Sequence, residues 1–319
     1  HLLLVYWDKT HLQKLKMRGK LQMGKGLSFT VVFRGNSLNY GEGIANISEL
    51  KKIHRGNGDV LSFASRQSIR YDIVRLGNEW FGWNLDTVDK KKGTLQFKEE
   101  VTIEDSVEMD FFGYLKTGKK SKKRPAVARL SHAISLEPYR SDLEFLNNMG
   151  LAERIDETPN LANIEQHESL YTYTLTLDID KVGKDGDVEL SSEEKVKRIN
   201  ELLEVIKLLN RNIRGRQESL SPLLAIGGVF PISNPFFLGK VSLEERTKQW
   251  NINTRALKDV LETTFNGKTV KDDTYIGYVS GVFGNEEEFK NLVGENAVSI
   301  EKFFDEIKRN ISDYFGVTV

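Results

Sequence analysis

The chain has 319 residues, of which 39% are hydrophobic and 29% charged, and its 46 basic and 46 acidic side chains give zero formal net charge. This length suits one large domain with insertions or two domains, and zero net charge means that no overall field attracts the chain to nucleic acid. The absence of cysteine excludes disulfides, thiolate metal sites and cysteine nucleophiles. No apolar run approaches the roughly 20 residues of a membrane-spanning helix. We therefore expect a cytoplasmic protein with no membrane partner.

Residues 1–24 are predicted to be an N-terminal extension. The opening HLLLVYW is short and precedes its basic residues, whereas the apolar part of a signal peptide follows them. Met23 comes just before the first convincing strand. We interpret residues 1–22 as an upstream extension or an expression remnant, and the alternative is a short amphipathic segment that packs on a partner.

Residues 25–35 are predicted to form a half-buried strand, because apolar residues alternate with polar residues such as Ser28 and Thr30. A loop rich in glycine and asparagine follows. Residues 61–77 then show the apolar spacing of an amphipathic helix, with Ser62 as the expected N-cap.

Arg66 and Arg70 lie four residues apart in this helix, and neither has an acidic residue three or four positions away. Like charges at this spacing cost a helix a few tenths of a kcal/mol. Both lie in the first half of the helix, where the macrodipole disfavours cations and where free backbone N–H groups favour an anion. With Ser65 and Gln67 beside them, they predict a phosphate-binding site at the start of the helix.

The charges that follow are segregated along the chain. Residues 99–110 hold six acidic residues and no basic one, whereas residues 115–125 hold six basic residues and no acidic one. The basic run is either a solvated loop or a strip that binds a polyanion. The candidate residues of this basic loop are Lys119, Lys120, Lys122, Lys123 and Arg124.

Two strands are predicted at residues 126–136 and 170–179 from their alternation. His132 falls on the apolar face of the first strand, and we interpret it as a core histidine. Residues 137–168, between the strands, are polar at both ends around a small apolar kernel. They are expected to leave the sheet and return to it.

The clearest helix begins at Ser191, which forms a capping-box pattern with Glu194. Arg211, Arg214 and Arg216 follow its end, where cations complement the negative end of the helix dipole. A structural role and a binding role therefore both stay open for these arginines.

Residues 223–239 and 274–283 are predicted strands, and residues 299–311 a closing amphipathic helix. The resulting order is strand, helix, strand pair, helix, strand, with two sizeable insertions. This order predicts the α+β class with an RRM-like (ferredoxin-like) core.

Familiar catalytic motifs are missing, since the chain has no G-x-S-x-G elbow, no phosphate-binding loop and no H-E-x-x-H. Residues 178–189 nearly match a calcium loop, with Asp178 and Glu189 at its first and last positions. Val182 occupies a ligand position, and a strand precedes the loop where an EF-hand requires a helix. A polar turn is the preferred interpretation, so we expect no metal, no cofactor and no catalytic residue.

Several stretches stand out in combination: LSFTVVFRG with SLNYGEG, SFASRQSIRYDIVR, ARLSHAISLEPYRSDLEFLNNMG and SLSPLLAIGG. Together they resemble the Cas7 backbone subunit of type I CRISPR Cascade, in the Cst2/DevR branch found with type I-B systems. The resemblance covers residues 25–239. It implies an RRM-like palm with helical fingers and a protruding thumb, polymerised head to tail along a guide RNA. The implied partners are this crRNA, the target DNA strand, other copies of the chain, and the Cas5, Cas8 and small subunits of Cascade.

The resemblance implies a division of the chain into an extension (1–24), the first half of the palm with the fingers (25–136), a thumb-like insertion (137–168), the second half of the palm with the long helix (169–240) and a C-terminal α/β segment that completes the palm (241–319). The RNA-binding candidates are Asn36, Asn39, Ser65, Arg66, Gln67, Arg70, Arg214 and Arg216. The thumb candidates are Arg140, Leu146 and Met149.

Two alternatives remain. Backbone subunits of type III complexes cut RNA with an aspartate in the loop between the first strand and the first helix, and here that loop offers Glu42, Glu49 and Asp59. The chain could then be a metal-dependent endoribonuclease. The second alternative is a stand-alone regulator that binds single-stranded RNA. We predict that the chain is not an enzyme, because its motifs supply no set of nucleophile, base and orienting group.

Overall fold

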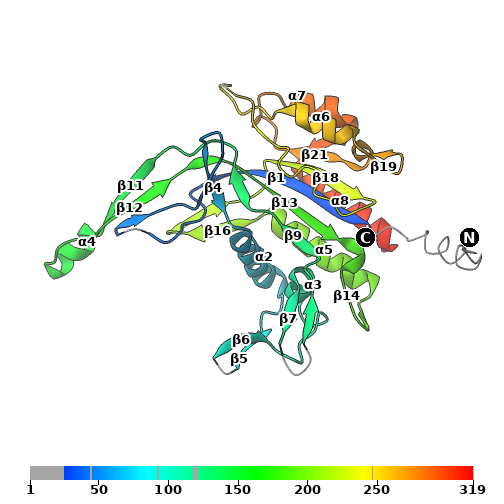
Figure 1. The fold of residues 1–319 in the computed structure, drawn as a ribbon, viewed down its shortest axis with the longest axis horizontal. Coiled ribbons are helices and arrows are strands. Elements are labelled where there is room, and N and C mark those ends of the chain that lie inside the picture. Colours follow the sequence, from blue (N-terminus) through cyan, green and yellow to red (C-terminus); the bar gives the residue numbers. More distant parts are fainter. Residues whose placement is uncertain (1–24, 44, 92, 118–120, 246, 319) are drawn as a thin grey trace, which may run out of the picture.

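The computed structural model describes residues 25–43, 45–91, 93–117, 121–245 and 247–318. A nine-stranded sheet forms its centre (Figure 1). The long strand β1 (Gly26–Asn36) pairs antiparallel with β13 (Glu168–Asp178) on one side and with β18 (Leu224–Phe230) on the other. The other strands of this central sheet are β3 (Lys52–His54), β4 (Val60–Ala64), β9 (Ala128–Leu130), β10 (Ala133–Ser135), β21 (Tyr275–Tyr278) and β22 (Ala297–Ser299).

Three helices cover one face of the central sheet: α2 (Arg66–Phe81), α5 (Ser192–Lys207) and α8 (Ile300–Phe315). Phe29 of β1 points into this layer and packs edge to face against Phe303 and Phe304, with ring centroids 5.9 Å apart in both pairs. The helix predicted after Ser191 is confirmed as α5, and the closing helix is confirmed as α8. The apolar periodicity of these helices fits the single face that each one buries.

The opposite face of β1 is also buried, so the prediction of a half-buried strand is wrong. Ser28 and Thr30 are 0% and 1% exposed, and they lie on the same side of the strand as Val32. Val32 belongs to a second apolar cluster built largely from the C-terminal part of the chain, with α6 (Thr254–Glu262) and α7 (Glu287–Val293). Because this cover comes from residues some 200 positions later, alternation within β1 could not reveal it.

Helix α2 begins after Ser65, whose hydroxyl accepts a hydrogen bond from the Ser68 N–H at 3.2 Å. Ser62, the expected N-cap, lies in β4, and its hydroxyl is 2.6 Å from Nδ1 of His167. The helix begins later than predicted because residues 60–64 are used to extend the sheet.

The strand predicted at residues 126–136 is interrupted between β9 and β10. Ser131 and His132 form a bulge there, and the Ser131 hydroxyl accepts a hydrogen bond from the Thr174 N–H of β13 at 2.9 Å. A bulge of this kind changes which side of the sheet a residue faces. His132 is consequently exposed, and its interpretation as a core histidine is wrong.

Residues 142–166 form an arm that leaves the central sheet and returns to it (Figure 1). The arm consists of β11 (Asp142–Asn147), α4 (Met149–Ala152), the 3-10 turn η1 (Glu153–Ile155) and β12 (Leu161–Gln166). Its strand β12 also pairs in parallel with β2 (Ile47–Ser48). Every residue of β11 is exposed, and α4 lies at the far end of the arm.

Residues 82–127 form a second protrusion, here called the insertion lobe. It contains β5 (Val88–Lys91), β6 (Thr94–Phe97), α3 (Val107–Phe112), β7 (Tyr114–Lys116) and β8 (Lys122–Arg124). The expectation of a helical insertion is therefore wrong in detail, because the described part of the lobe has two hairpins and one six-residue helix.

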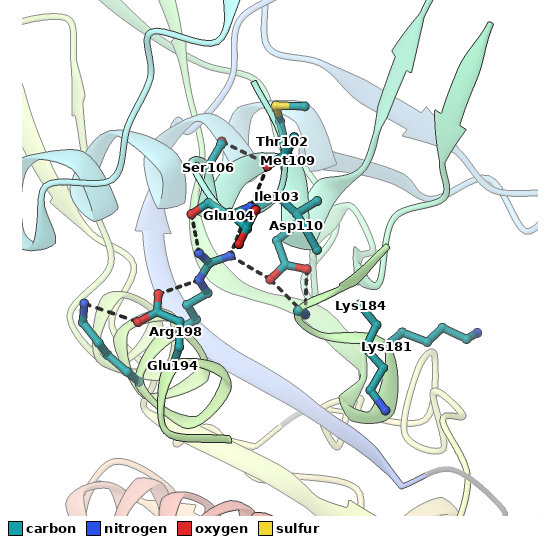
Figure 2. Close-up of polar contacts among 12 residues, drawn as sticks. Thr102, Ile103, Glu104, Ser106, Met109, Asp110, Lys181, Lys184, Glu194 and Arg198 are labelled. Carbon is teal, nitrogen blue, oxygen red and sulfur yellow. Dashed lines mark hydrogen bonds and ion pairs between the residues drawn. The ribbon is translucent and has the colours of Figure 1, made fainter. Parts of the chain in front are cut away.

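A buried cluster of charges fastens the insertion lobe to α5 (Figure 2). The Asp110 carboxylate accepts hydrogen bonds from Arg124 at 2.7 Å and Arg198 at 3.0 Å. It also accepts one from the Gly183 N–H at 3.0 Å, and Arg198 donates to two backbone carbonyls of the lobe. Burial raises the pKa of Asp110, whereas the Gly183 hydrogen bond and both guanidinium groups favour its charged form.

The segment that resembles a calcium loop is a polar turn. Residues 178–189 contain the 3-10 turn η2 (Ile179–Lys181) and the hairpin of β14 (Lys184–Asp185) and β15 (Val188–Glu189). Asp178 forms ion pairs with Arg129 and Lys181, each at 3.0 Å. Within the described ranges, no three His, Cys, Asp or Glu residues are grouped so that they could hold a metal ion. Those same ranges contain no helix long and apolar enough to cross a membrane.

Candidate nucleic-acid interface

Three segments with predicted RNA-binding residues meet where β1 ends. They are the loop after β1, the start of α2, and the hairpin of β16 (Asn210–Ile213) and β17 (Arg216–Ser219). The Ser65 N–H donates to Oδ1 of Asn39 at 3.0 Å, which joins the loop to the helix. Arg216 donates to the backbone carbonyl of Asn36 at 3.2 Å, which joins the hairpin to the end of β1. The structure thus brings these four predicted residues together.

Arg214 lies in the turn of the same hairpin and is exposed. It has a positive φ of 50°, and it donates to the Ser48 hydroxyl at 3.0 Å. Its guanidinium carbon lies 4.8 Å from the centre of the Tyr40 ring. These contacts fix the direction of Arg214 while leaving its charge accessible, since neither partner is acidic.

Arg211 of β16 is buried and links the hairpin to both α2 and the loop after β1. Its Nε lies 2.6 Å from the Asp72 carboxylate of α2, and its Nη1 donates to the Leu38 carbonyl at 2.6 Å. Both charged side chains are buried. Burial raises the pKa of Asp72, and the Arg211 guanidinium opposes that shift. Arg211 therefore has the structural role that the sequence left open for it.

The start of α2 is not a free helix terminus, which corrects the expectation of unsatisfied N–H groups there. The Ser65 hydroxyl caps the Ser68 N–H, and the Arg66 N–H donates to Nδ1 of His132 at 3.0 Å. Two of the donors that could bind a phosphate are thus already used. Any anion at this site must depend chiefly on side chains.

Arg66 and Arg70 differ in their surroundings. Arg66 is exposed, and it has no ion pair with any residue that the structure describes. Arg70 forms an ion pair with Glu108 of α3 at 2.8 Å, and its guanidinium carbon lies 4.8 Å from the centre of the Phe112 ring. The expectation that both arginines lack partners is wrong for Arg70, because α3 is folded against α2 by contacts far from both in sequence.

The basic loop divides into surface and structural residues. Lys122 and Lys123 are exposed, whereas Lys119 and Lys120 lie outside the described residues. Arg124 is buried in the Asp110 cluster, so it is not a surface cation as predicted.

Lys116, in the same basic run, is also buried. It donates to the backbone carbonyls of Glu99 and Val101 at 2.9 and 2.6 Å. Burial lowers the pKa of Lys116. One lysine of the basic run is thus hydrogen-bonded to the backbone of the acidic run and is not available at the surface.

Two of the predicted thumb residues lie on the arm and the third lies just before it, and all three are exposed. Leu146 and Met149 are 39% and 51% exposed, and Arg140 lies just before β11. Other apolar side chains of the arm are also exposed, although the thumb candidates did not include them: Leu143, Phe145, Leu151, Ile155 and Leu161. Apolar residues in a strand usually indicate burial against a core. In the arm, β11 is held by its pairing with β12 alone, so its apolar side chains stay exposed.

Polar contacts hold the arm where it joins the sheet. The Glu165 carboxylate accepts hydrogen bonds from Lys52 at 2.6 Å and from the Leu50 N–H at 2.7 Å. Burial alone would raise the pKa of Glu165, but these hydrogen bonds lower it. His167 lies two residues after Glu165. Burial lowers the pKa of His167, and this favours the neutral imidazole, whose Nδ1 lies beside the Ser62 hydroxyl.

The acidic residues considered for RNA cleavage are dispersed. Glu42 is exposed in the loop after β1, and Glu49 follows β2. Asp59 lies in the turn between β3 and β4, where its carboxylate accepts a hydrogen bond from Asn57 at 2.7 Å and lies 3.9 Å from Arg55. Asp59 is thus held by contacts local to its own turn.

Beside the start of α2 is a hollow that the sequence did not reveal. It is lined by Arg66, Gln67, Arg70, Phe112, Ala126, Ala128, Arg129 and Leu130. These residues come from three separate segments of the chain, so no local spacing predicts their meeting. Phe112 and Arg129 are the functional candidates that sequence reasoning missed.

Comparison with known proteins adds a family and a fold. The family model described as CRISPR-associated negative auto-regulator DevR/Csa2 matches residues 27–269. One similar solved structure, a chain of a "CRISPR RNA-guided surveillance complex, pre-nicking", is 11% identical with a TM-score of 0.57, and the match covers 90% of this chain and 100% of that one. Another, from a "CRISPR RNA-guided surveillance complex", is 12% identical with a TM-score of 0.52, covering 91% and 99%. No curated protein matches in sequence.

Proposed function

Because this chain belongs to the DevR/Csa2 family of CRISPR-associated proteins, we propose that it is a crRNA-binding backbone subunit of a type I-B CRISPR interference complex. Copies associate head to tail along the guide and present it for pairing with a target DNA strand. The central sheet serves as an RRM-like palm, the insertion lobe as fingers and the arm as thumb. Cas5, Cas8 and small subunits complete the assembly, which acts in the cytoplasm.

The observation that carries this proposal is the surface at the start of α2. There, exposed Arg66 and Gln67 lie beside a loop and a hairpin that Arg211 holds in place. A protein that accepts guides of any sequence must bind phosphates and sugars and leave base edges free for pairing. Arg66 supplies a charge for a phosphate, and Gln67 supplies a neutral hydrogen bond. Both groups are independent of base sequence.

The first test is the composition of the purified protein. Expression with its CRISPR RNA should give one discrete large assembly with the absorbance ratio of a ribonucleoprotein, and expression without it should not. A protein that stays a single unit on RNA would instead favour the regulator, an alternative that the description of the family as a negative auto-regulator keeps in view.

The second test concerns Arg66. Replacing Arg66 by Gln should weaken binding of single-stranded RNA equally for all sequences, and it should flatten the dependence of log affinity on log salt by about 0.7 per subunit. The matched control is Arg255→Gln, because Arg255 is also exposed in the first turn of a helix, α6. An unchanged slope for Arg66→Gln, or the same change in the control, would show that Arg66 does not bind the guide backbone.

We also propose that the chain does not cut nucleic acid. The local contacts of Asp59 support this, because its carboxylate is engaged within its own turn. Incubating the pure protein with paired target RNA and magnesium should leave the RNA intact. Steady cleavage that Asp59→Ala abolishes would establish the endoribonuclease instead.

A further inference from the structure

The helices α5 and α8 pack side by side on the central sheet (Figure 1), and a groove of about 660 Å³ lies between them near the end of α8. This α5–α8 groove is at the start of β1, because Tyr314, next to the lining residue Asp313, has the Lys25 ammonium group 6.0 Å from its ring centre. The candidate nucleic-acid interface is at the other end of β1. The 11 residues of this strand span about 35 Å. The α5–α8 groove is therefore a separate site, and its ligand does not depend on the proposed function.

Two acidic side chains of the α5–α8 groove lack a cationic partner. Asp305 and Asp313 of α8 line the groove, and both are exposed. Neither has an ion pair with any residue that the structure describes, whereas the basic lining residues, Lys308 and Arg309, are each paired with a glutamate. The lining therefore keeps the negative charges of the two aspartates.

The position of Asp313 also favours a cationic ligand. Asp313 lies in the last turn of α8, where the helix macrodipole is negative and cations are the stabilising side chains. This turn contains no basic residue. An acidic side chain there destabilises the helix end unless a cation comes from another molecule.

Two buried polar groups of the lining lack a partner as well. Ser312 is 2% exposed, and its hydroxyl has no hydrogen-bond partner among the described residues. The amide oxygen of Asn200, on the α5 side of the groove, is likewise buried and without a partner among them. Buried polar groups that make no hydrogen bond are rare in native proteins because they cost free energy. Both oxygens can accept a hydrogen bond, and an ammonium group offers three donors and no acceptor.

We propose that the α5–α8 groove binds a linear polyamine, whose ammonium groups pair with Asp305 and Asp313. These two residues are separated along α8 by a rise of about 12 Å. A single ammonium group cannot contact both carboxylates, whereas an extended triamine such as spermidine has a charge at each end of a chain of comparable length. The ammonium group at Asp313 donates to the Ser312 hydroxyl and the Asn200 amide oxygen. The other terminal ammonium group lies at Asp305, one face of α8 away from the core.

The test is titration calorimetry of the full chain purified without RNA, because RNA itself binds polyamines. The ligands are spermidine and n-butylamine, which carries the single ammonium group that also ends a lysine side chain. Both are titrated in about 0.15 M salt, which screens diffuse attraction. The double variant Asp305→Asn/Asp313→Asn removes both charges, and Ser312→Ala removes the hydroxyl and keeps the charges. The matched control is Asp259→Asn, because Asp259 is also exposed near the end of a helix, α6, and has no ion pair within the described residues. Thermal unfolding without ligand checks that each variant keeps the fold.

The wild-type protein should bind one spermidine per chain, at least about tenfold more tightly than n-butylamine, because a second charged contact is made. The double variant should lose at least about tenfold in spermidine affinity, and Ser312→Ala should lose roughly threefold or more. Asp259→Asn should bind as the wild type does. Spermidine should also raise the Tm of the wild type and leave that of the double variant unchanged.

Equal affinity of the wild type for spermidine and n-butylamine would show that the groove takes a single ammonium group, such as a lysine side chain, and would overturn the polyamine site. An equal loss in Asp259→Asn, or no loss in Ser312→Ala, would show only diffuse attraction to acidic surface and would overturn it too.

Discussion

The central strand β1 and the arm are both extended segments rich in apolar residues, but they differ in what covers them. Nine of the 11 residues of β1 are buried, between the helical layer and the C-terminal cluster. All six residues of β11 are exposed, including Leu143 and Phe145. The apolar side chains of β1 therefore stabilise this chain itself, whereas those of the arm remain available to another molecule.

The largest expected effect is the loss of an aromatic ring from β1. Phe29→Ala should lower the free energy of unfolding by about 3–5 kcal/mol, because it leaves a cavity against Phe303 and Phe304. Phe145→Ala on the arm should change it by less than about 0.5 kcal/mol. Denaturant titration of both variants measures the difference. Equal losses would mean that the arm is packed as firmly as the sheet.

The second prediction tests whether contacts of the insertion lobe contribute to the stability of the fold, as those of β1 do, or contribute little, as those of the arm do. Asp110→Asn leaves Arg124 and Arg198 buried without their carboxylate, which should lower the free energy of unfolding by about 3 kcal/mol. The control is Asp86→Asn, since the ion pair of Asp86 with Lys98 is exposed and should contribute less than about 1 kcal/mol. If both variants have the same free energy of unfolding, the lobe, like the arm, does not contribute to the stability of the core.

The third prediction removes most of the arm. Residues 145–163 can be replaced by Asn-Gly, because the flanking residues Glu144 and Ile164 are paired across the two strands. The free energy of unfolding should change by about 1 kcal/mol or less, and Glu165 keeps its contact with Lys52. Ordered assemblies on guide-length RNA should no longer form, as judged by sedimentation and electron microscopy. Ordered assemblies that persist without these residues would show that residues 137–168 are not the thumb.

The smallest effect is expected at the two arginines of α2. Arg70→Gln leaves Glu108 without its ion-pair partner and removes the contact with the Phe112 ring. This change should lower the free energy of unfolding by about 1 kcal/mol. Arg66→Gln should change stability by no more than a few tenths of a kcal/mol, because it relieves repulsion and breaks no ion pair. Chemical denaturation of both proteins in low salt makes the comparison. A larger loss of stability for Arg66→Gln than for Arg70→Gln would show that Arg66, and not Arg70, has the structural role.

The elements that the sequence predicts correctly are those whose pattern is complete within one segment. The helices α5 and α8 carry their own caps and apolar stripes, and β13 and β18 carry their own apolar runs. The excursion of residues 137–168 is also visible, because polar ends separate it from both strands. The α+β class follows from these elements alone.

The failures concern contacts between distant segments. Arg124 reads as a loop cation because its partner Asp110 lies 14 residues away, and Arg70 reads as unpaired because Glu108 lies 38 residues away. His132 reads as buried because the bulge beside it leaves no mark on the alternation. The hollow needs three segments at once, so no single stretch of sequence could predict it.

The position of β1 at the centre of the sheet has a consequence for synthesis of the chain. Strand β1 emerges first, but its partners β13 and β18 end at Asp178 and Phe230. At about 5–20 residues per second, roughly 10–40 s pass between the release of Asn36 and that of Phe230. Until Asp178 is released, an apolar strand has both hydrogen-bonding edges unpaired, and the edge that pairs with β18 stays unpaired until Phe230; this is the condition that promotes aggregation. The yield of folded protein should therefore depend on temperature and on chaperone supply during translation more than on the stability of the finished chain.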